Sequence, residues 1–373
     1  MLRPEEKSGP SRPRAHLVLA DGTVFEGWAF GARGTAVGEL VFTTGMTGYQ
    51  EVLTDPSYAG QIVVMTAPHI GNTGVNEEDE ESIRPALSAF VIHAESPIVS
   101  NWRAKGSLED YLIAHGIVGI VGVDTRTLTR HIRDWGAQMA ALGTEGVECL
   151  LERARNAPPI SGQDLTPKVR AKEPYEWTEG LFGRTPKKRR FHVVVLDFGV
   201  KRNILRHLVD RGCHVTVLPG DAKAKDVLAL RPHGILISNG PGDPAAVEYG
   251  IECIRSLLGE KPIFGICLGH QMLAIALGGR TYKMKFGHRG INHPVKHLRT
   301  GRIEITTQNH GFAVDFKSLE DRCTLTHVHL NDGTCMGIEA RELKAFSVQY
   351  HPEASAGPHD SAYLFDAFVS ALE

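Results

Sequence analysis

The pattern of hydrophobic and polar positions changes character near residue 191 of this 373-residue chain. Beyond that point, runs of aliphatic residues alternate with segments of helical periodicity. Strands are predicted at residues 193–196, 215–218 and 235–237, and helices at residues 202–209 and 226–230. Aliphatic strands separated by helices predict an α/β domain over residues 191–373, with a parallel sheet covered on both faces. Ligand sites of such sheets lie beyond the carboxyl ends of the strands.

The first half of the chain mixes strand-like alternation with short helical patterns. A hairpin is predicted over residues 16–28 around an Asp-Gly turn, and more strand signal follows at residues 61–66. Ser107 and Asp124 stand where N-caps would begin two helices. This mixture predicts a separate mixed α+β N-terminal domain over residues 15–156.

Two segments show neither helical nor strand-like periodicity. Residues 1–14 carry proline and glutamate where a signal peptide would be apolar, so we expect a disordered tail there. Residues 157–190 contain five prolines, scattered charges and a basic run at their end, as an interdomain linker would. After residue 279 the pattern breaks into shorter strand-like segments, and a final helix is predicted at residues 361–372.

The segment Pro-Ile-Phe-Gly-Ile-Cys-Leu-Gly-His-Gln, residues 262–271, holds the first candidate for chemistry. A buried strand ends in Gly-x-Cys-x-Gly and a helical pattern begins at Gln271, which predicts a nucleophile elbow. The sulfur of Cys267 would stand at the tip of the turn, where helix-end amides favour its thiolate. The amide of Leu268 would point at an oxyanion formed there. The alternative is a buried cysteine at a strand end that only packs.

The segment Gln-Tyr-His-Pro-Glu, residues 349–353, offers a general base for this cysteine. His351 would remove the thiol proton, and Glu353 would fix the tautomer and the orientation of the imidazole. If residues 345–350 form a strand, both side chains can project from its end toward the elbow. Since a single histidine among the eighteen present is most often structural, the prediction depends on elbow, histidine and carboxylate occurring together.

A loop at residues 238–244 follows a predicted strand and holds Gly240 and Gly242 on either side of a proline. Residues without Cβ let a ligand approach the backbone closely, and a turn with positive φ would need the same residues. The loop and Cys267 both fall beyond the carboxyl ends of predicted strands. This shared position favours a role for the loop in substrate binding and, through the Gly240 amide, in an oxyanion hole.

Three of these motifs resemble the class I (triad) glutamine amidotransferases: the loop Ser-Asn-Gly-Pro-Gly-Asp-Pro, the elbow, and His-Pro-Glu at residues 351–353. Four others are similar to the small subunits of carbamoyl-phosphate synthases. They are Thr-Gly-Tyr-Gln-Glu at 47–51, Asp-Pro-Ser-Tyr at 55–58, Gln-Asn-His-Gly-Phe at 308–312 and Gly-Pro-His-Asp at 357–360. The resemblance runs from about residue 15 to the C-terminus. It implies a C-terminal class I amidotransferase domain with a central, mostly parallel sheet.

The resemblance implies hydrolysis of L-glutamine through a γ-glutamyl thioester on Cys267. His351 would take the thiol proton and return it to the departing ammonia, Glu353 would orient His351, and the amides of Leu268 and Gly240 would stabilise the oxyanion. The ammonia would pass to a large synthetase subunit that makes carbamoyl phosphate from bicarbonate, for arginine and pyrimidine biosynthesis. No cofactor is expected on this chain, and ATP and Mg²⁺ would bind the partner.

The same resemblance implies a set of glutamine-binding positions. They are Gly45, Gly240, Gly242, Leu268, Gln271, Asn309, Gly311 and Phe312. The segment 45–58 would approach glutamine from the N-terminal domain. Gly45 departs from the family pattern, in which a serine is common and is thought to contact the amino-acid end of glutamine. Glycine offers no hydroxyl, so that contact would be absent or replaced, unless the position needs a conformation that only glycine adopts.

The composition of the chain limits the partners, cofactors and locations that can be expected. A formal net charge of −2 argues against nucleic acid as an obligate partner. No apolar run approaches the roughly 20 residues of a membrane span. The six cysteines show no CxxC or zinc-ligand spacing, so we expect no metal site and a cytoplasmic location. No Walker-type GxxxxGK[ST] loop occurs, which places any ATP chemistry on another chain.

Three alternatives remain open from the sequence. A glutaminase subunit of another pathway would share the chemistry and differ in the enzyme that accepts ammonia. A non-catalytic docking or ammonia-channel subunit would not need the cysteine, histidine and glutamate together. A thioesterase of α/β-hydrolase type would need no partner, but it would leave the first 150 residues without a role.

Overall fold

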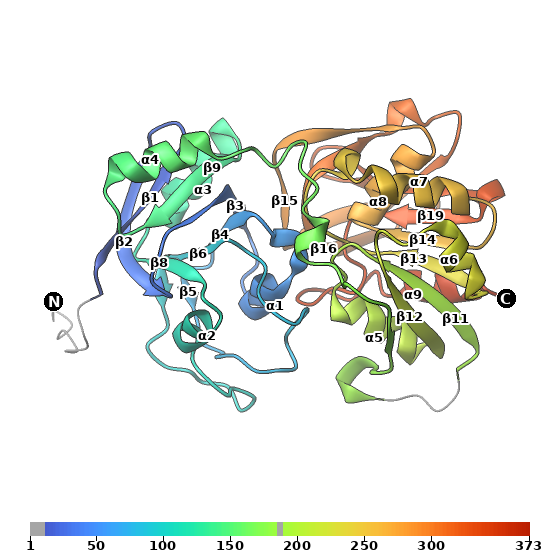
Figure 1. Ribbon diagram of the computed structural model, residues 1–373, viewed down its shortest axis with the longest axis horizontal. Helices are drawn as coiled ribbons and strands as arrows, with labels where there is room; N and C mark the ends of the chain where they lie inside the picture. The colour runs from blue at the N-terminus through green and yellow to red at the C-terminus, as the bar shows by residue number, and fades with distance from the viewer. Residues whose placement is uncertain (1–11, 185–188) are drawn as a thin grey trace.

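The structure is a computed structural model, and it describes residues 12–184 and 189–373. Two lobes lie side by side, one from each half of the chain (Figure 1). Of the tail expected at residues 1–14, residues 1–11 lie outside the described part, and Arg14 already begins strand β1. No helix within the described ranges is long and apolar enough to cross a membrane.

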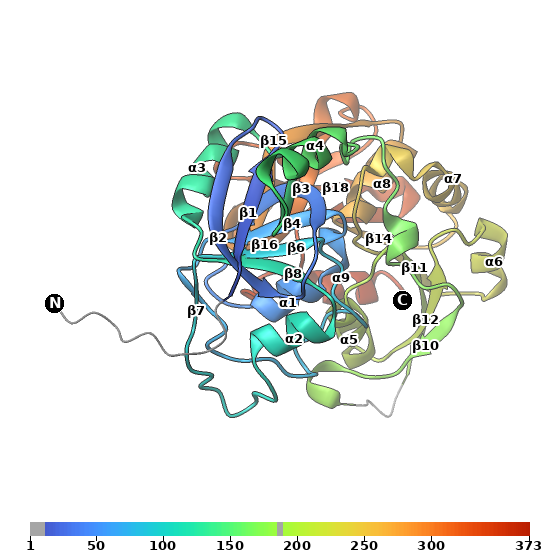
Figure 2. The ribbon, with the colours of Figure 1, turned by 60° about the vertical axis from the view of Figure 1, so that its left-hand side comes forward.

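The N-terminal lobe is a closed barrel with the strand order β1-β2-β8-β6-β4-β3-β9, and its strands curl around one another in Figure 2. The strands are β1 (Arg14–Leu19), β2 (Val24–Gly31), β3 (Ala36–Thr43), β4 (Gln61–Met65), β6 (Ala89–Ile92), β8 (Val118–Val121) and β9 (Gln138–Gly143). The lobe also contains β5 (His69–Ile70), β7 (Ala94–Glu95), α2 (Leu108–Ala114), α3 (Thr125–Trp135) and α4 (Val147–Asn156). Ser107 and Asp124 cap α2 and α3 through their side chains, as predicted.

The segment 45–58, expected to approach glutamine from the N-terminal domain, contains helix α1 (Tyr49–Thr54) and the 3₁₀ turn η1 (Pro56–Tyr58). Tyr49 anchors the helix in the barrel through its hydroxyl, which donates to the carbonyl oxygen of Gly74 at 2.6 Å. Gly48 precedes the helix with φ 78°, and a Cβ there would collide with Ala356 of the other lobe. Glycine is therefore required at this position by both conformation and close approach.

The C-terminal lobe is built on a 10-stranded sheet with the order β10-β12-β11-β13-β14-β19-β18-β17-β15-β16. In that order the strands are Tyr175–Trp177, Cys213–Pro219, Phe191–Asp197, Gly234–Ile237, Ile263–Ile266, Ala345–Val348, Cys335–Ala340, Thr324–His329, Arg280–His297 and Ile303–Asp315. The helices are α5 (Arg202–Asp210), α6 (Ala224–Ala229), α7 (Glu248–Leu257), α8 (Leu268–Ala276) and α9 (Tyr363–Ser370). From β12 to β19 neighbouring strands are parallel.

Helices cover both faces of the parallel strands, as the sequence predicted. On β11, Val194 and Leu196 face one way and pack in a cluster with residues of α6, α7 and α8. Val193 and Val195 face the other way and pack with α5 and α9. Both sides of the strand are thus buried, which explains its continuous aliphatic sequence. The carboxyl ends of β13, β14 and β19 meet at one edge, where the two lobes adjoin (Figure 1).

Two parts of this lobe differ from the sequence prediction. Directly after residue 279 the chain forms the long antiparallel strands β15 and β16 where short segments were predicted, because bulges between Lys283 and His288 and between Gly290 and His293 interrupt the alternation that a continuous strand would show. The later strands β17, β18 and β19 are short, as predicted. The segment 157–190, expected as a linker, adds β10 to the sheet edge beside β12. Its aromatic residues pack against the cluster beneath α5, which holds the short strand in place.

Candidate active site

Cys267 lies at the sharp turn between β14 and α8, where the sequence predicted a nucleophile elbow. Its backbone has φ 53° and ψ −102°, a conformation that costs a non-glycine residue about 1–3 kcal/mol. The glycines on either side make the turn possible. A Cβ on Gly269 would collide with the carbonyl oxygen of Ile237, and a Cβ on Gly265 would lie 2.8 Å from that of Gly269. Backbone strain is therefore concentrated at the residue that carries the sulfur.

The elbow places Cys267 at the N-terminus of α8, which begins at Leu268. Amides in the first turn of a helix have no intrahelical acceptor, and the helix dipole there favours a negative charge. The glycine loop packs directly on this turn: a Cβ on Gly240 would lie 2.8 Å from Cδ2 of Leu268 and would collide with the carbonyl oxygen of Phe198. The structure therefore brings together the two segments whose amides were expected to form an oxyanion hole.

His351 follows β19, which pairs in parallel with β14, so the ends of the two strands bring histidine and cysteine to the same edge. Nδ1 of His351 lies 2.7 Å from Oε1 of Glu353, and both side chains are buried. Since the carboxylate can only accept there, Nδ1 carries the proton. Nε2 of His351 is buried and has no hydrogen-bond partner among the described residues, so it is available to Cys267.

The charged groups around His351 and Glu353 stabilise one another's ionised forms. Burial alone would lower the pKa of His351, but the Glu353 carboxylate and the Cys267 sulfur raise it to about 10. Burial would raise the pKa of Glu353, but Lys201 and His351 lower it to about 2. At neutral pH the carboxylate is therefore ionised, and the histidine is poised to hold a proton taken from sulfur.

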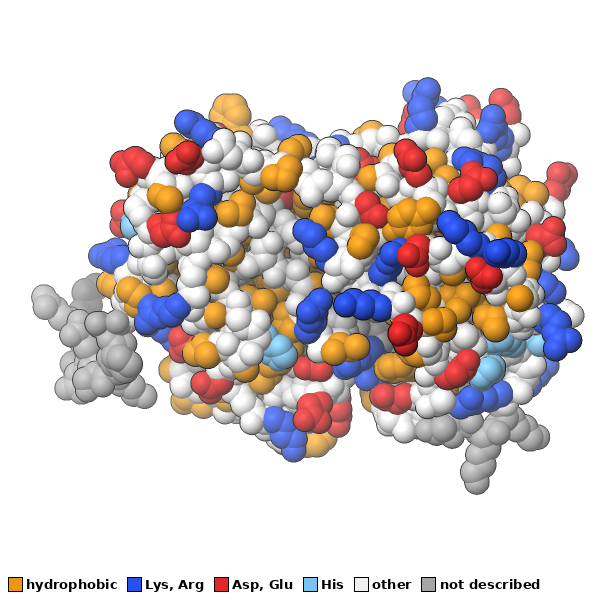
Figure 3. Space-filling view, viewed as in Figure 1, with side chains coloured by type: hydrophobic (Ala, Val, Ile, Leu, Met, Phe, Trp, Pro, Cys, Tyr) orange, Lys and Arg blue, Asp and Glu red, His pale blue; other side chains and the backbone are white. Residues whose placement is uncertain are grey.

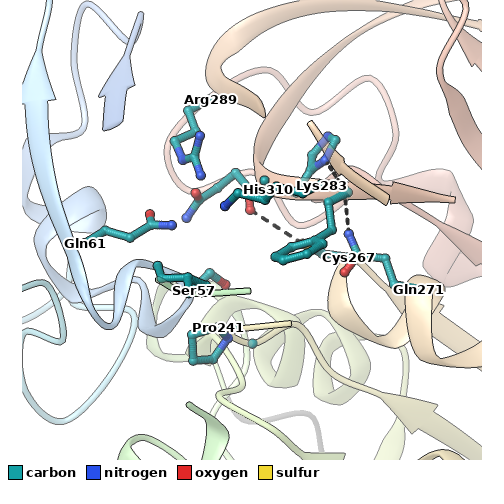
Figure 4. Close-up of a pocket in the computed structure, with 14 residues that line it drawn as sticks. Ser57, Gln61, Pro241, Cys267, Gln271, Lys283, Arg289 and His310 are labelled. Carbon is teal, nitrogen blue, oxygen red and sulfur yellow. Dashed lines mark hydrogen bonds between the residues drawn. The ribbon is translucent and has the colours of Figure 1, made fainter. Parts of the chain in front are cut away.

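A pocket of about 360 Å³, its open mouth included, lies beside Cys267 at the junction of the lobes (Figure 4). Its lining residues are Ser57, Gln61, Ile160, Gly240, Pro241, Gly242, Cys267, Gln271, Lys283, Arg289, Asn309, His310, Gly311 and Phe312. Of the positions expected to bind glutamine, only Gly45 and Leu268 are absent from this lining. Leu268 packs beneath the elbow, and Gly45 lines an adjoining cavity that shares Asn309 with this pocket.

Hydrogen bonds hold the lining side chains in place. Nε2 of Gln271 donates to the carbonyl oxygen of Phe312 at 2.8 Å and to Oε1 of Gln349 at 3.1 Å. Nδ2 of Asn309 donates to Oδ2 of Asp55 at 2.8 Å, which ties β16 to the N-terminal lobe. Both N–H groups of the Gln271 amide are engaged, which leaves its oxygen for a ligand, whereas Asn309 keeps one N–H besides its amide oxygen.

Comparison with known proteins assigns both lobes. Residues 17–142 match the family "Carbamoyl-phosphate synthase small chain, CPSase domain", and residues 194–371 match "Glutamine amidotransferase class-I". The carbamoyl phosphate synthase small chain of Syntrophotalea carbinolica is 56% identical over 368 residues, covering 96% of this chain and 98% of that protein. The chain belongs to the carbamoyl phosphate synthase small chain family. The chloroplastic small chain of Oryza sativa is 50% identical over 367 residues, covering 96% of this chain and 82% of that one.

Lys201, immediately before α5, is a member of the site that the sequence analysis missed. Its Nζ donates to Oε1 of Glu353 at 3.0 Å and to the carbonyl oxygen of Ala354 at 2.6 Å, and the side chain is 2% exposed. Burial lowers the pKa of Lys201, but Glu353, Glu81 and Asp55 outweigh it and raise the pKa above its ordinary value. The available signal was its position just after the carboxyl end of β11.

Lys283 and Arg289 are two further lining residues that the sequence did not single out. Both belong to β15, and in Figure 4 the Arg289 side chain enters the pocket from the side opposite Pro241. Lys283 pairs with Glu39 of the barrel at 2.7 Å. The pocket therefore has a positively charged wall, at the end where the amino-acid group of glutamine was expected.

One group of side chains within residues 12–184 and 189–373 has the composition of a metal site, although none was predicted. Ligand atoms of His288, His329 and Asp332 lie within 4.8 Å of one another. These atoms already contact each other: Nε2 of His288 lies 2.8 Å from Oδ2 of Asp332, and Nδ1 of His329 lies 3.5 Å from Oδ1. Asp332 also accepts from the amide of Thr334 at 3.0 Å. The group accordingly supports the turn between β17 and β18.

Proposed function

We propose that this chain is the glutaminase subunit of a carbamoyl-phosphate synthase and that Cys267, His351 and Glu353 are its catalytic residues. The observation that carries the proposal is the buried arrangement of a strained, helix-capping cysteine with a histidine and a carboxylate 2.7 Å apart. A merely structural cysteine would need neither the strain nor the ion pair. The family assignment supports glutamine as the substrate, since its C-terminal domain is of the glutamine amidotransferase type.

In the proposed reaction His351 takes the proton of Cys267, and the sulfur attacks the side-chain carbonyl carbon of glutamine. The amides of Leu268 and Gly240 donate to the oxyanion of the tetrahedral intermediate. His351 then gives its proton to the leaving nitrogen, and ammonia departs as the γ-glutamyl thioester forms. Water, deprotonated by His351, attacks the thioester and releases glutamate and the free thiol. Glu353 orients His351 and stabilises its cation throughout.

The remaining predicted positions would hold the amino-acid end of glutamine. Gln271, Asn309, Gly311 and Phe312 all line the pocket, and hydrogen bonds hold the side-chain amides of Gln271 and Asn309 in place, which supports this role. Gly242 has φ 94° and lines the opposite wall, where a Cβ would lie 2.7 Å from the carbonyl oxygen of Gln163. A side chain there would therefore meet both strain and collision.

Ammonia would be delivered to a large subunit that holds ATP and Mg²⁺ and makes carbamoyl phosphate from bicarbonate. Several hydrophobic side chains on the N-terminal lobe support a docking surface there, among them Trp102, 93% exposed, and Ile98, 68% exposed. On the face seen in Figure 3, charges of both signs are interspersed, in keeping with a protein partner. The cytoplasmic location expected from the sequence stays a prediction.

The rival reading as a glutaminase of another pathway is not favoured, because the N-terminal lobe matches the small-chain domain over residues 17–142.

The thioester itself offers a direct test of the chemistry. Acid quenching of the wild-type chain during turnover of radiolabelled glutamine should leave label bound to protein, and Cys267→Ser should leave none. Label of equal amount on both proteins would refute Cys267 as the nucleophile.

A further inference from the structure

The positively charged wall of the pocket contains a cation for which the catalytic steps have no use. Arg289 is 3% exposed, and its Nη1 donates to the carbonyl oxygen of Phe286 at 2.8 Å. Nε of Arg289 is buried without a hydrogen-bond partner, and the guanidinium forms no ion pair with a carboxylate, among residues 12–184 and 189–373. A buried charge is ordinarily paired and fully hydrogen-bonded, so this guanidinium indicates a missing anion.

The neighbouring charges do not supply that anion. Glu39 is 5% exposed, and its two oxygens lie 2.7 and 3.0 Å from Nζ of Lys283. Glu39 thus pairs with Lys283, and Asp243 is a second carboxylate near enough to raise the pKa of that lysine, but neither forms an ion pair with the guanidinium within the described residues. Burial lowers the pKa of Arg289, and Glu39 opposes this shift without cancelling it. A carboxylate entering the pocket would give the guanidinium the direct ionic partner that it lacks.

The two cations converge on the place where the amino-acid end of glutamine is expected. A Cβ added to Gly311 would lie 3.2 Å from Nη2 of Arg289 and 3.2 Å from Nζ of Lys283. Gly311, Arg289 and Cys267 line the same pocket. Cys267 is also near enough to influence the pKa of Arg289. An extended ligand bonded to the sulfur at one end could therefore meet the guanidinium at the other.

We propose that Arg289, assisted by Lys283, forms an anion subsite that binds the α-carboxylate of free glutamine and discriminates against amides without that carboxylate. The inference rests on the proposed glutaminase function. A guanidinium presents a fork of N–H donors whose geometry matches a carboxylate. Since the carboxylate is remote from the scissile amide, the contact is equally strong in ground and transition states. It should therefore lower KM and leave kcat little changed.

A comparison of two substrates tests the subsite in the purified complex of the full chain with its large subunit. One substrate is L-glutamine, and the other is its α-amide, in which a neutral carboxamide replaces the carboxylate. Arg289→Met should lower kcat/KM for glutamine by about ten- to a hundredfold, mainly through KM, as for a lost charged hydrogen bond. The same variant should change kcat/KM for the α-amide by less than about threefold, because that substrate never had the ionic contact.

Two further variants separate binding from folding. Arg280→Met removes an exposed arginine at the start of the same strand and should leave both substrates unaffected. Arg289→Lys keeps the charge without the fork, and it should show a smaller loss, again for glutamine alone. The lysine variant also keeps the test decisive if Arg289→Met fails to fold.

Equal losses on glutamine and on the α-amide would overturn the subsite, because they would show that Arg289 only maintains the pocket. An unchanged KM for glutamine in Arg289→Met and Arg289→Lys would overturn it as well. Failure of the proposed function would look different, since the wild-type complex would then release no glutamate from glutamine. The two failures are thus distinguishable in one set of measurements.

Discussion

Replacing Lys201 by methionine should destabilise the fold through the buried carboxylate of Glu353. Nζ of Lys201 lies 3.0 Å from Oε1 of Glu353, and it is the strongest of the influences that lower the pKa of that carboxyl from 4.5 to about 2. A shift of this size corresponds to about 3 kcal/mol of native-state stability at pH 7. A buried ion pair that loses one partner costs about 3–5 kcal/mol. Because Glu353 keeps its contact with His351 at 2.7 Å, we expect the free energy of unfolding to fall by about 3 kcal/mol, the lower end of that range.

The pH dependence distinguishes the lost charge from lost packing. Because the pKa of Glu353 is depressed in the folded state, its stabilisation is present above its unfolded pKa of about 4.5 and is lost as the pH falls toward about 2. Without Lys201 the folded pKa of Glu353 rises, so the carboxylate is protonated at a higher pH. The deficit of Lys201→Met should thus be largest near pH 7 and disappear as the pH falls through about 4.5 toward about 2.

Urea unfolding across this pH range measures the deficit directly. Lys225→Met is the matched control, since Lys225 is exposed on α6 and should cost less than about 0.5 kcal/mol at any pH. A deficit for Lys201→Met that stays constant from pH 7 down to about pH 3 would refute the electrostatic reasoning and leave only a packing role for the side chain.

Three other outcomes are expected. In glutamine hydrolysis, His351→Asn should lower kcat more than Glu353→Gln, since a neutral amide still orients the imidazole; the reverse order in steady-state assays would mean that the roles are wrong. Gly45→Ser should lower the KM for glutamine by about two- to tenfold, because Gly45 has no positive φ and lines the same cavity as Asn309. A raised or unchanged KM would show that the hydroxyl does not reach the substrate. The isolated chain should be a poor glutaminase that its large subunit activates, since the pocket gathers residues from both lobes; equal glutamate release with and without that subunit would contradict this.

The parallel half of the sheet could be predicted because its strands are buried on both faces. Val193 to Leu196 are all buried, so the strand appears in the sequence as an unbroken aliphatic run. Strand β15 could not be recognised in the same way. Its residues Lys283 and His288 stand on either side of a bulge in the pairing with β16, the next strand along the chain, and a second bulge follows Gly290. Each bulge interrupts the alternation of side chains between the two faces, so no single period runs through the strand.

The same distinction separates the two groups of site residues. The sequence reveals Cys267 through the glycines two residues to either side of it. It reveals His351 through the glutamate two residues later. Lys201 and Arg289 stand in no motif that spacing reveals, and basic residues at a random position are mostly solvated. Their significance arises from burial, which places one against Glu353 and leaves the other without a counterion. Burial of this kind depends on the contact between lobes, which a local pattern does not encode.

The central claim, that Cys267 generates ammonia for a separate synthetase chain, is tested most directly by Cys267→Ser in the purified complex. Carbamoyl phosphate synthesis is measured with glutamine and, separately, with ammonium salts as the nitrogen source. The account predicts that the variant loses glutamine-dependent synthesis, because a serine hydroxyl is a far weaker nucleophile than a thiolate, and that it keeps synthesis from ammonia. Loss of both activities, or retention of glutamine-dependent synthesis, would contradict it.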